Sequence, residues 1–314
     1  MAKKIHHLHD KFVKASFSDP DRAISFFERF LPDKLLDEID IKSLKVTQES
    51  YIQDDLTEHF SDIVFEVTAK DDESVDLVLL FEHKSSPDKY VLIQVGHYIF
   101  SHYFKCISEK KPLKLILPLI YYQGKKQWRE PDLASLFPKL SNTLSDFIPI
   151  IKHVFIALKS LSNDSIENIR NGMMAAAVMA QRSAFDPIKL AADFQRIFTL
   201  FSESKDRGNF LEQLFVYVLN VSDIQQAEIN KAFDSIPTNI KDNIMTTYSR
   251  IQIEEQLKGE QIGIQKGEQI GIQKRQKEII LSLHEDQISL AQIAKYTNLT
   301  VAEVENILKG KGKF

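Results

Sequence analysis

Two neighbouring runs of apolar and β-branched residues, 62–67 and 75–81, constrain the fold of this chain more than any other feature. The polar stretch 70–74 between them is typical of a hairpin loop, so the two runs are predicted to be paired strands. Ser-Ser-Pro at 85–87 ends the second run, and the apolar spacing over 88–105 then indicates a helix. We therefore expect an α/β protein in which a helix packs directly beside the paired strands.

Charged side chains stand at the ends of both predicted strands. Asp62 begins the first strand, and Glu82 and Lys84 end the second. Side chains two apart along a strand point to the same face, so Glu82 and Lys84 are expected on one side of the sheet and His83 on the other. Gln94 lies on the helix that follows and is expected next to this site.

These residue types suit the hydrolysis of a phosphodiester. The negative charge of the ester repels a nucleophile, so hydrolysis needs a divalent cation that neutralises the charge and makes a bound water more acidic. Mg²⁺ prefers hard oxygen ligands, which Asp62, Glu82 and the main-chain carbonyl of His83 can supply. Lys84 is placed to orient the attacking water. The pattern predicts a metal-dependent nuclease site with Mg²⁺ as its cofactor.

Further motifs accompany this constellation. They are His-Asp-Lys-Phe-Val-Lys at 9–14, Leu31-Pro32, Ser61-Asp62, Phe-Glu-His-Lys-Ser-Ser-Pro-Asp at 81–88, Gln94 followed by Tyr98, and Tyr-Tyr-Gln-Gly at 121–124 with Trp128. Together they resemble the Rpn family of recombination-promoting nucleases, which are also described as transposases and belong to the PD-(D/E)XK superfamily. The resemblance covers residues 5–220.

The resemblance implies a PD-(D/E)XK restriction-endonuclease-like core of order αβββαβ, Mg²⁺-dependent cleavage of DNA and a role in recombination. Carried over position by position, the resemblance makes Asp62 and Glu82 the metal ligands and Lys84 the catalytic lysine. It makes Gln94 an accessory contact and Asp10 a further acid. Ser61 stands where the superfamily name has proline, and no chemistry depends on that proline. Some family members carry glutamine at the position of Lys84, so the lysine here favours an active enzyme.

Composition bounds the remaining alternatives. The apolar fraction, 43%, is that of a globular protein, and 314 residues suggest two or more units. The single cysteine, Cys106, rules out an internal disulfide framework and suits a reducing cytoplasm. The N-terminal residues lack the apolar stretch of a signal peptide. The most apolar segment, 113–122, is too short to span a bilayer and is expected to be the last strand of the core. We therefore expect a cytoplasmic protein that does not bind membranes.

The chain is predicted to have four consecutive parts. They are a nuclease core (1–160), an α-helical C-terminal extension (161–250), a linking helix that contains a repeat (251–280) and a helix-turn-helix-like helical hairpin (281–314). Within the extension, apolar residues recur at helical spacing over 172–180, 188–201 and 210–219. The net charge of −4 is uninformative about DNA, because a local basic groove can bind phosphates on an acidic protein.

Eight residues, 259–266, recur identically as 267–274. The apolar residues of this region form a slowly drifting helical seam: Ile253, Leu257, Ile264, Ile272, Ile279 and Leu283. Against a helix, each glycine costs about 1 kcal/mol, the alternating isoleucines of the repeat also fit a strand, and a solvated linker is a further alternative. We favour a long helix through which the chain forms a homo-oligomer.

Residues 289–292 and 300–303 each match a capping box and predict two helix starts eleven residues apart. Thr297-Asn298 can form the turn between them, which gives the outline of a helix-turn-helix. Two glutamates of the second helix, 301–309, would repel phosphates, and the lysines that follow partly offset them. DNA binding by this tail and dimerisation or partner binding therefore both stay open.

The predicted function is that of a Mg²⁺-dependent DNA endonuclease associated with recombination, mobile elements or phage defence. Two alternatives from other classes remain. The chain could be a noncatalytic interaction or DNA-binding module that self-assembles through its helical C-terminus. It could also be a nuclease that acts on RNA, because the same ion chemistry cuts either backbone. The expected partners are DNA and a second copy of the chain.

Overall fold

The computed structural model describes residues 8–47, 63–70, 76–202, 209–221, 265–269 and 271–310, together with positions 241, 249 and 261. It divides into two compact units, residues 1–245 and 246–314. The predicted hairpin loop lies almost entirely outside the described residues. Among the described helices, none has the length and apolar character needed to cross a lipid bilayer.

A five-stranded mixed sheet forms the centre of the first unit. In spatial order its strands are β1 (Ile39–Thr47), β2 (Ile63–Ala69), β3 (Asp76–Lys84), β4 (Leu115–Tyr122) and β5 (Val154–Ala157). The first three strands are antiparallel, and β3, β4 and β5 are parallel. The predicted strand pair is confirmed, with Ile63 opposite Phe81 in β2 and β3.

The prediction that 113–122 forms the last strand of the core is wrong, because β5 follows it. This strand pairs in parallel with the end of β4, where Val154 lies opposite Leu119. Its four residues, Val-Phe-Ile-Ala, are too few to show a periodicity of their own. The sheet therefore has one strand more than the αβββαβ order implies.

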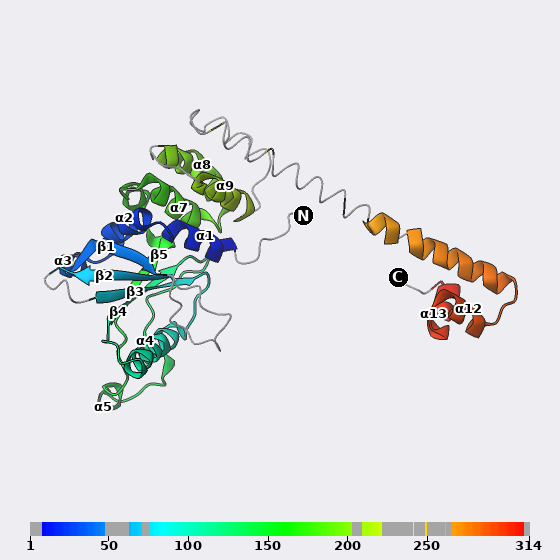
Figure 1. Ribbon diagram of the computed structural model, residues 1–314, viewed down its shortest axis with the longest axis horizontal. Helices are drawn as coiled ribbons and strands as arrows, with labels where there is room; N and C mark the ends of the chain where they lie inside the picture. Colours follow the sequence, from blue (N-terminus) through cyan, green and yellow to red (C-terminus); the bar gives the residue numbers. More distant parts are fainter. Residues whose placement is uncertain are drawn as a thin grey trace. The chain divides into compact units, whose positions relative to one another are not determined.

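Helices cover the two faces of the sheet differently. Before the sheet come α1 (Leu8–Phe17), α2 (Pro20–Phe30) and α3 (Asp33–Glu38), whereas α4 (Val91–Ser108) connects the parallel strands β3 and β4. Figure 1 shows α1 and α2 on one face of the sheet and α4 on the other. Asp19 caps α2 by accepting a hydrogen bond from the backbone N–H of Arg22, and Pro20 occupies the first helical position.

Alternate residues of the strands point to the two faces of the sheet and pack against different helices. Val64, Ile116 and Ile120 pack with Val91 and Val95 of α4. On the other face, aromatic side chains are fully buried between the sheet and the first two helices: Phe17, Phe26, Phe27, Phe65, Phe81 and Tyr121. Fully buried phenylalanines on that face and a mainly aliphatic cluster with Tyr98 on the other give each layer its own core.

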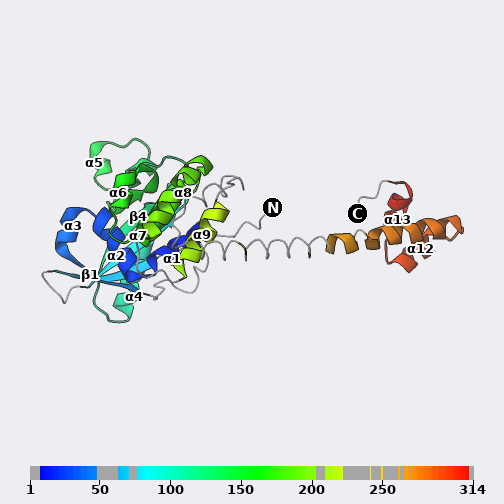
Figure 2. The same ribbon diagram turned by 90° about the horizontal axis from the view of Figure 1, so that it is seen from above.

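The helical extension packs on the α1 side of the sheet. Its predicted helices are confirmed as α7 (Gly172–Ser183), α8 (Pro187–Ser202) and α9 (Phe210–Val221). Figures 1 and 2 show α7 and α9 beside α1, and the ring of Phe12 stacks on that of Tyr217 at 4.0 Å. Shorter elements occur between β4 and α7 along the chain: η1 (Leu133–Leu136), α5 (Asn142–Ser145), η2 (Leu158–Ser160) and α6 (Asn163–Glu167).

The second unit is a small helical cluster. Residues 271–285 are helical and are followed by α12 (Leu290–Thr297) and α13 (Val301–Leu308), with Asn298 in the left-handed conformation at the turn. Its core consists of apolar side chains from all three segments: Ile280, Ile293, Ala294, Val304 and Ile307. The two predicted helix starts are confirmed.

Only one of the two predicted capping boxes forms. Thr300 and Glu303 exchange both hydrogen bonds of the motif. Ser289 instead donates its hydroxyl to the side chain of Gln292 at 3.1 Å, so the first capping box is wrong. The described residues of the second repeat copy, 267–269 and 271–274, are helical and exclude a strand there. Three seam residues, Ile253, Leu257 and Ile264, lie outside the described residues.

Candidate active site

Four polar side chains meet at the end of β3, on the α4 side of the sheet. The Lys84 ammonium lies 2.8 Å from Oε1 of Glu82 and 3.2 Å from Oδ2 of Asp88. It also donates a hydrogen bond of 2.8 Å to Oε1 of Gln94. The structure therefore brings together Glu82, Lys84 and Gln94, whereas Asp62 and Ser61 lie outside the described residues.

Local structure explains how these groups converge. Glu82 and Lys84 alternate with His83 at the last positions of β3, where they lie opposite Ile120 and Tyr122 of β4. The backbone N–H of Gln123 donates to the Lys84 carbonyl at 2.8 Å and extends the parallel pairing by one step. The chain then turns through Ser-Ser-Pro into α4, whose second turn carries Gln94 back over the strand end.

Charge and burial oppose each other at Lys84. Burial lowers the pKa of the ammonium, but the carboxylates of Glu82 and Asp88 together outweigh burial, and the pKa lies above its ordinary value of 10.5. Lys84 is therefore a permanent cation at neutral pH. Glu82 is itself only 4% exposed, so its carboxylate depends on a cation nearby. Asp88 is a site residue that sequence reasoning missed, although it follows Lys84 by four positions.

The side chain of His83 points to the opposite face of the sheet, as predicted. Its Nδ1 lies 2.8 Å from Oδ1 of Asp10 on α1, and its Nε2 lies 3.3 Å from Oε1 of Gln123. The structure thus places Asp10 against His83 and on the other side of β3 from the Glu82 and Lys84 side chains.

Gln123 is oriented by its other contacts. Its amide nitrogen donates to the carbonyl of Gln181 at 3.1 Å and to the hydroxyl of Tyr217 at 2.6 Å. A backbone carbonyl only accepts, so the amide nitrogen faces Gln181 and the amide oxygen faces His83. Both ring nitrogens of His83 therefore lie beside oxygen atoms, one of Asp10 and one of Gln123.

The groups around His83 form a buried polar network, defined by Asp10, His83, Gln123, Gln181 and Tyr217. Burial raises the pKa of the Tyr217 hydroxyl, although its bond with Gln123 acts the other way. Gln123, Gln181 and Tyr217 were not predicted from the sequence as site residues. Only Gln123 had a sequence signal, because it lies in the Tyr-Tyr-Gln-Gly motif. In that motif, a side chain at Gly124 would clash with the ring of Tyr122.

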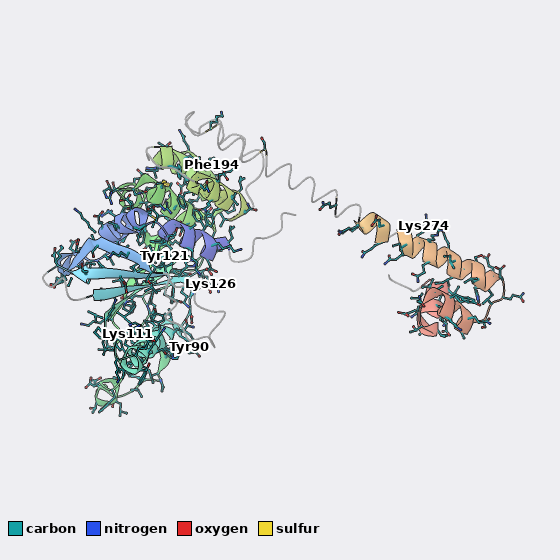
Figure 3. All side chains as sticks on the ribbon, viewed as in Figure 1. Tyr90, Lys111, Tyr121, Lys126, Phe194 and Lys274 are labelled. Carbon is teal, nitrogen blue, oxygen red and sulfur yellow. The ribbon has the colours of Figure 1, made fainter. Side chains whose placement is uncertain are left out.

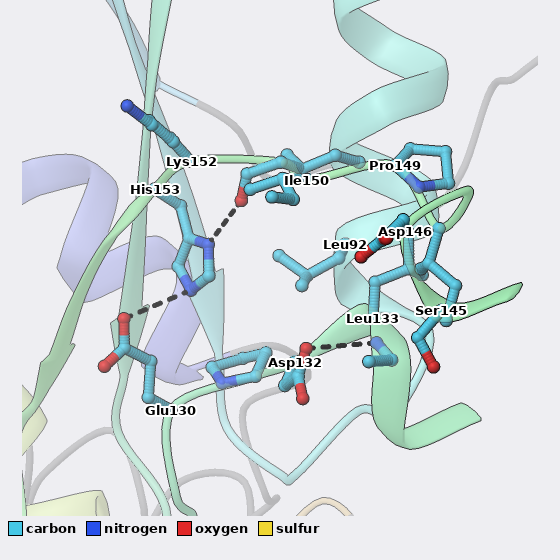
Figure 4. A pocket seen from close by; sticks show the side chains of 14 residues that line it. Leu92, Glu130, Asp132, Leu133, Ser145, Asp146, Pro149, Ile150, Lys152 and His153 are labelled. Carbon is cyan, nitrogen blue, oxygen red and sulfur yellow. Dashed lines mark hydrogen bonds and ion pairs between the residues drawn. The ribbon is translucent and has the colours of Figure 1, made fainter. Parts of the chain in front are cut away.

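A cavity of about 670 Å³ opens beside the N-terminal end of α4 (Figure 4). Its walls include Leu92, the acids Glu130, Asp132 and Asp146, and His153. His153 Nδ1 donates to the Ile151 carbonyl at 3.0 Å, and its Nε2 lies 3.8 Å from a carboxylate oxygen of Glu130. Three acids in the wall make this cavity unsuited to phosphate groups.

Comparison with known proteins identifies relatives of this chain. Recombination-promoting nuclease RpnA of Escherichia coli (strain K12) is 24% identical over 316 residues, which cover 94% of this chain and 95% of RpnA. Inactive recombination-promoting nuclease-like protein RpnE of the same strain is 24% identical and covers 95% of this chain and 96% of its own length. Nuclease RpnD of Escherichia coli O157:H7 is 26% identical over 49% of this chain and 65% of its own length. No solved structure matches the chain.

The relatives thus include proteins named as nucleases and proteins named as inactive. The resemblance to the Rpn family is confirmed. The family described as "Putative transposase, YhgA-like" matches residues 7–212, a range that contains the whole sheet, α4 and every side chain at the end of β3. Because this match covers more than half of the 314 residues, the chain belongs to that YhgA-like family.

Proposed function

We propose that this chain is a Mg²⁺-dependent endonuclease that hydrolyses DNA phosphodiester bonds, in recombination or in mobile-element or phage-defence activity. The observation that carries the proposal is the convergence of Glu82, Asp88 and Gln94 on the Lys84 ammonium. The order of the elements supports it, because α1, β1, β2, β3, α4 and β4 follow each other as in the αβββαβ order of a PD-(D/E)XK core. Named nucleases among the relatives support it further.

The donor atoms at this site fit Mg²⁺. Two carboxylates, Glu82 and Asp88, lie around one ammonium, so the site carries more negative than positive charge. Within the described part of the chain, no group of three His, Cys, Asp or Glu side chains could hold a metal ion. Mg²⁺ does not require such a cage, because it is commonly held by one or two carboxylates together with waters and substrate phosphates. Glu82, Asp62 and the carbonyl of His83 are the proposed ligands.

Each residue then has a defined role in hydrolysis. When bound, the ion would neutralise the phosphate and make a water molecule more acidic. Lys84 stays an ammonium at neutral pH, so it orients water or stabilises negative charge and does not remove a proton. Gln94 accepts one of the three N–H groups of Lys84 and fixes the direction of the remaining ones. No covalent intermediate with the protein is required.

The test compares cleavage of plasmid DNA and of RNA with the same sequence, in Mg²⁺ and in EDTA. Asp62→Ala, Glu82→Gln and Lys84→Met are the site variants. A second Glu-x-Lys pair supplies matched controls, because Glu109 and Lys111 lie 2.7 Å apart at the exposed end of α4. Glu109→Gln and Lys111→Met therefore make the same chemical changes away from β3.

Cleavage of DNA that requires Mg²⁺, persists in both control variants and is lost in all three site variants is the expected result. Preferential cleavage of RNA would support the proposed site but would mean that the substrate is RNA and not DNA. Equal behaviour of all variants, with unchanged circular dichroism, would contradict the nuclease and leave a noncatalytic interaction module.

For the second unit we propose self-association through the helix 271–285. Ile272 and Ile279 are exposed and lie seven residues apart, so they share one face of this helix. Replacing both by glutamate is expected to lower the mass of the particle in sedimentation. DNA binding by α12 and α13 is the alternative, and it predicts a changed DNA affinity with an unchanged particle mass.

A further inference from the structure

An apolar stripe runs along the outer face of α4. Ile93, Phe100, Phe104 and Ile107 are 51%, 62%, 71% and 61% exposed. With 3.6 residues per turn, these four positions lie within an arc of roughly 60°. We call them the α4 stripe. Tyr90 and Lys111, labelled in Figure 3, mark the two ends of the helix. The opposite face of α4 is already occupied, because its apolar residues are buried against the sheet.

Neighbouring apolar side chains enlarge this surface. Gly96 lies at the edge of the α4 stripe, and Ile151 packs so closely against it that an added Cβ would touch its side chain at 2.8 Å. The segment that contains Ile151 thus runs along α4. It also carries Phe147 and Ile150, which are 81% and 87% exposed. Three of the six exposed side chains are phenylalanines, each of which can bury roughly 150–250 Å². With the three isoleucines, the surface approaches the roughly 800 Å² that each partner contributes to a standard interface.

The spacing of the α4 stripe is the same in both directions. Ile93 and Ile107 each stand seven residues, or about two helical turns, from Phe100. In an antiparallel pair of such helices, Ile93 of each copy faces Ile107 of the other, and the two Phe100 rings meet at the centre. A two-fold interface requires this kind of self-complementary surface.

Charge is compatible with the same pairing. The exposed residue that lies between the apolar positions of the stripe is His97, so no aspartate, glutamate, lysine or arginine would meet its own copy at the centre. Antiparallel packing also places the positive N-terminal end of each helix dipole beside the negative C-terminal end of the other. We propose that the α4 stripe is a homodimer interface, in which α4 packs antiparallel against α4 of a second copy around a two-fold axis at Phe100.

This arrangement has a consequence for the site at β3, which rests on the proposed nuclease function. Gln94 stands six residues from Phe100 and about a quarter turn away from the stripe, so the two-fold axis keeps both Gln94 residues on the same side of the helix pair. With helix axes about 8–10 Å apart, the two Gln94 residues lie roughly 20 Å from each other. Both sites would then open toward a single duplex.

Cysteine cross-linking of the full chain tests the pairing. Phe100→Cys is expected to form a disulfide between two chains under mild oxidation, because the two positions meet at the axis. Ile93→Cys alone is expected to form none, because its own copy lies too far for the Cα separation of about 4–7 Å that a disulfide requires. The double variant Ile93→Cys/Ile107→Cys should cross-link again. The parent chain is the control, because its native Cys106 is buried.

A second substitution separates the interface from accidental collision. Adding Phe104→Glu to Phe100→Cys should abolish the cross-link, since two carboxylates would be buried at the interface. Adding Ile188→Glu on α8, which changes an isoleucine that is even more exposed than Phe104 and lies on the other face of the sheet, should leave the cross-link intact. The proposal fails if Ile93→Cys cross-links as readily as Phe100→Cys, or if Phe100→Cys does not exceed the parent chain. Neither readout depends on nuclease activity or on association through the second unit.

Discussion

The end of β3 presents two different environments within three consecutive residues. On the α4 side, Glu82 and Lys84 form a charged group that includes Asp88 and Gln94. On the α1 side, His83 joins a polar network that runs from Asp10 through Gln123 to Gln181 and Tyr217. The alternation of a strand therefore separates side chains suited to chemistry from side chains that hold the strand in place.

The two sides also differ in how completely their charges are balanced. Lys84 is paired with two carboxylates, those of Glu82 and Asp88, so these three groups carry an excess of negative charge that favours the binding of a cation. On the other face, Nδ1 of His83 lies 2.8 Å from an oxygen of the single carboxylate of Asp10. An incompletely balanced site gains stability when it binds a cation, whereas a balanced one gains none. Substitutions on the two sides should therefore affect different measured quantities.

The largest effect is expected for activity on the α4 side. Glu82→Gln should lower the rate of Mg²⁺-dependent cleavage by on the order of 10³, as removal of a charge-stabilising group does in other enzymes. Its free energy of unfolding should fall by only about 1 kcal/mol, because the new amide oxygen can still accept a hydrogen bond from Lys84 and Asp88 still faces the ammonium. Urea unfolding measured alongside cleavage checks both. A fall in stability as large as the fall in activity would show that Glu82 is structural.

For Asp10→Asn on the α1 side, we expect a larger effect on stability than on activity. Removing the carboxylate leaves His83 without its anionic partner, and the free energy of unfolding should fall by about 1–3 kcal/mol, less than for a fully buried pair because Asp10 is partly exposed. Cleavage per folded molecule should stay within about tenfold. Asp33→Asn is the control, since Asp33 also lies in the first turn of a helix and matches any effect on the helix dipole.

A smaller change is expected where the buried polar network reaches α9. Tyr217→Phe removes the hydroxyl that accepts a hydrogen bond from Gln123 and contacts Nδ1 of His9, but the Gln123 amide keeps its bond to the Gln181 carbonyl and its contact with His9. The free energy of unfolding should therefore fall by only about 1 kcal/mol. Tyr90→Phe on the exposed end of α4 should have no measurable effect. A loss of cleavage without a loss of stability would contradict this prediction and would mean that Tyr217 contributes to activity, as the residues on the α4 side are expected to do.

Sequence patterns predicted one side of β3 far better than the other. Glu82, Lys84 and Gln94 lie within thirteen positions, and the period of a strand followed by that of a helix suffices to bring them together. Gln123 reaches His83 from just after β4, 40 positions along the chain, and Tyr217 reaches Gln123 from α9, 94 positions further. No local period links such residues. β5 was missed for a related reason, since its four residues form a strand only because β4 offers them an edge.

The last contrast concerns alkaline pH. Burial raises the pKa of Tyr217 above its ordinary value of 10.0, so the hydroxyl keeps its proton in the folded chain at a pH where the unfolded chain loses it. Its contribution to stability is therefore fully present below pH 10 and is lost as the pH rises toward the raised value, by up to about 1.4 kcal/mol per pH unit. Tyr217→Phe lacks this loss. Its deficit of about 1 kcal/mol at pH 8 should consequently close near pH 11. Denaturant titrations of the parent chain and of Tyr217→Phe at pH 8 and pH 11 measure this difference in the free energy of unfolding. The same difference at both pH values would mean that water reaches the Tyr217 hydroxyl, and that the α1 side of β3 excludes water no better than the α4 side.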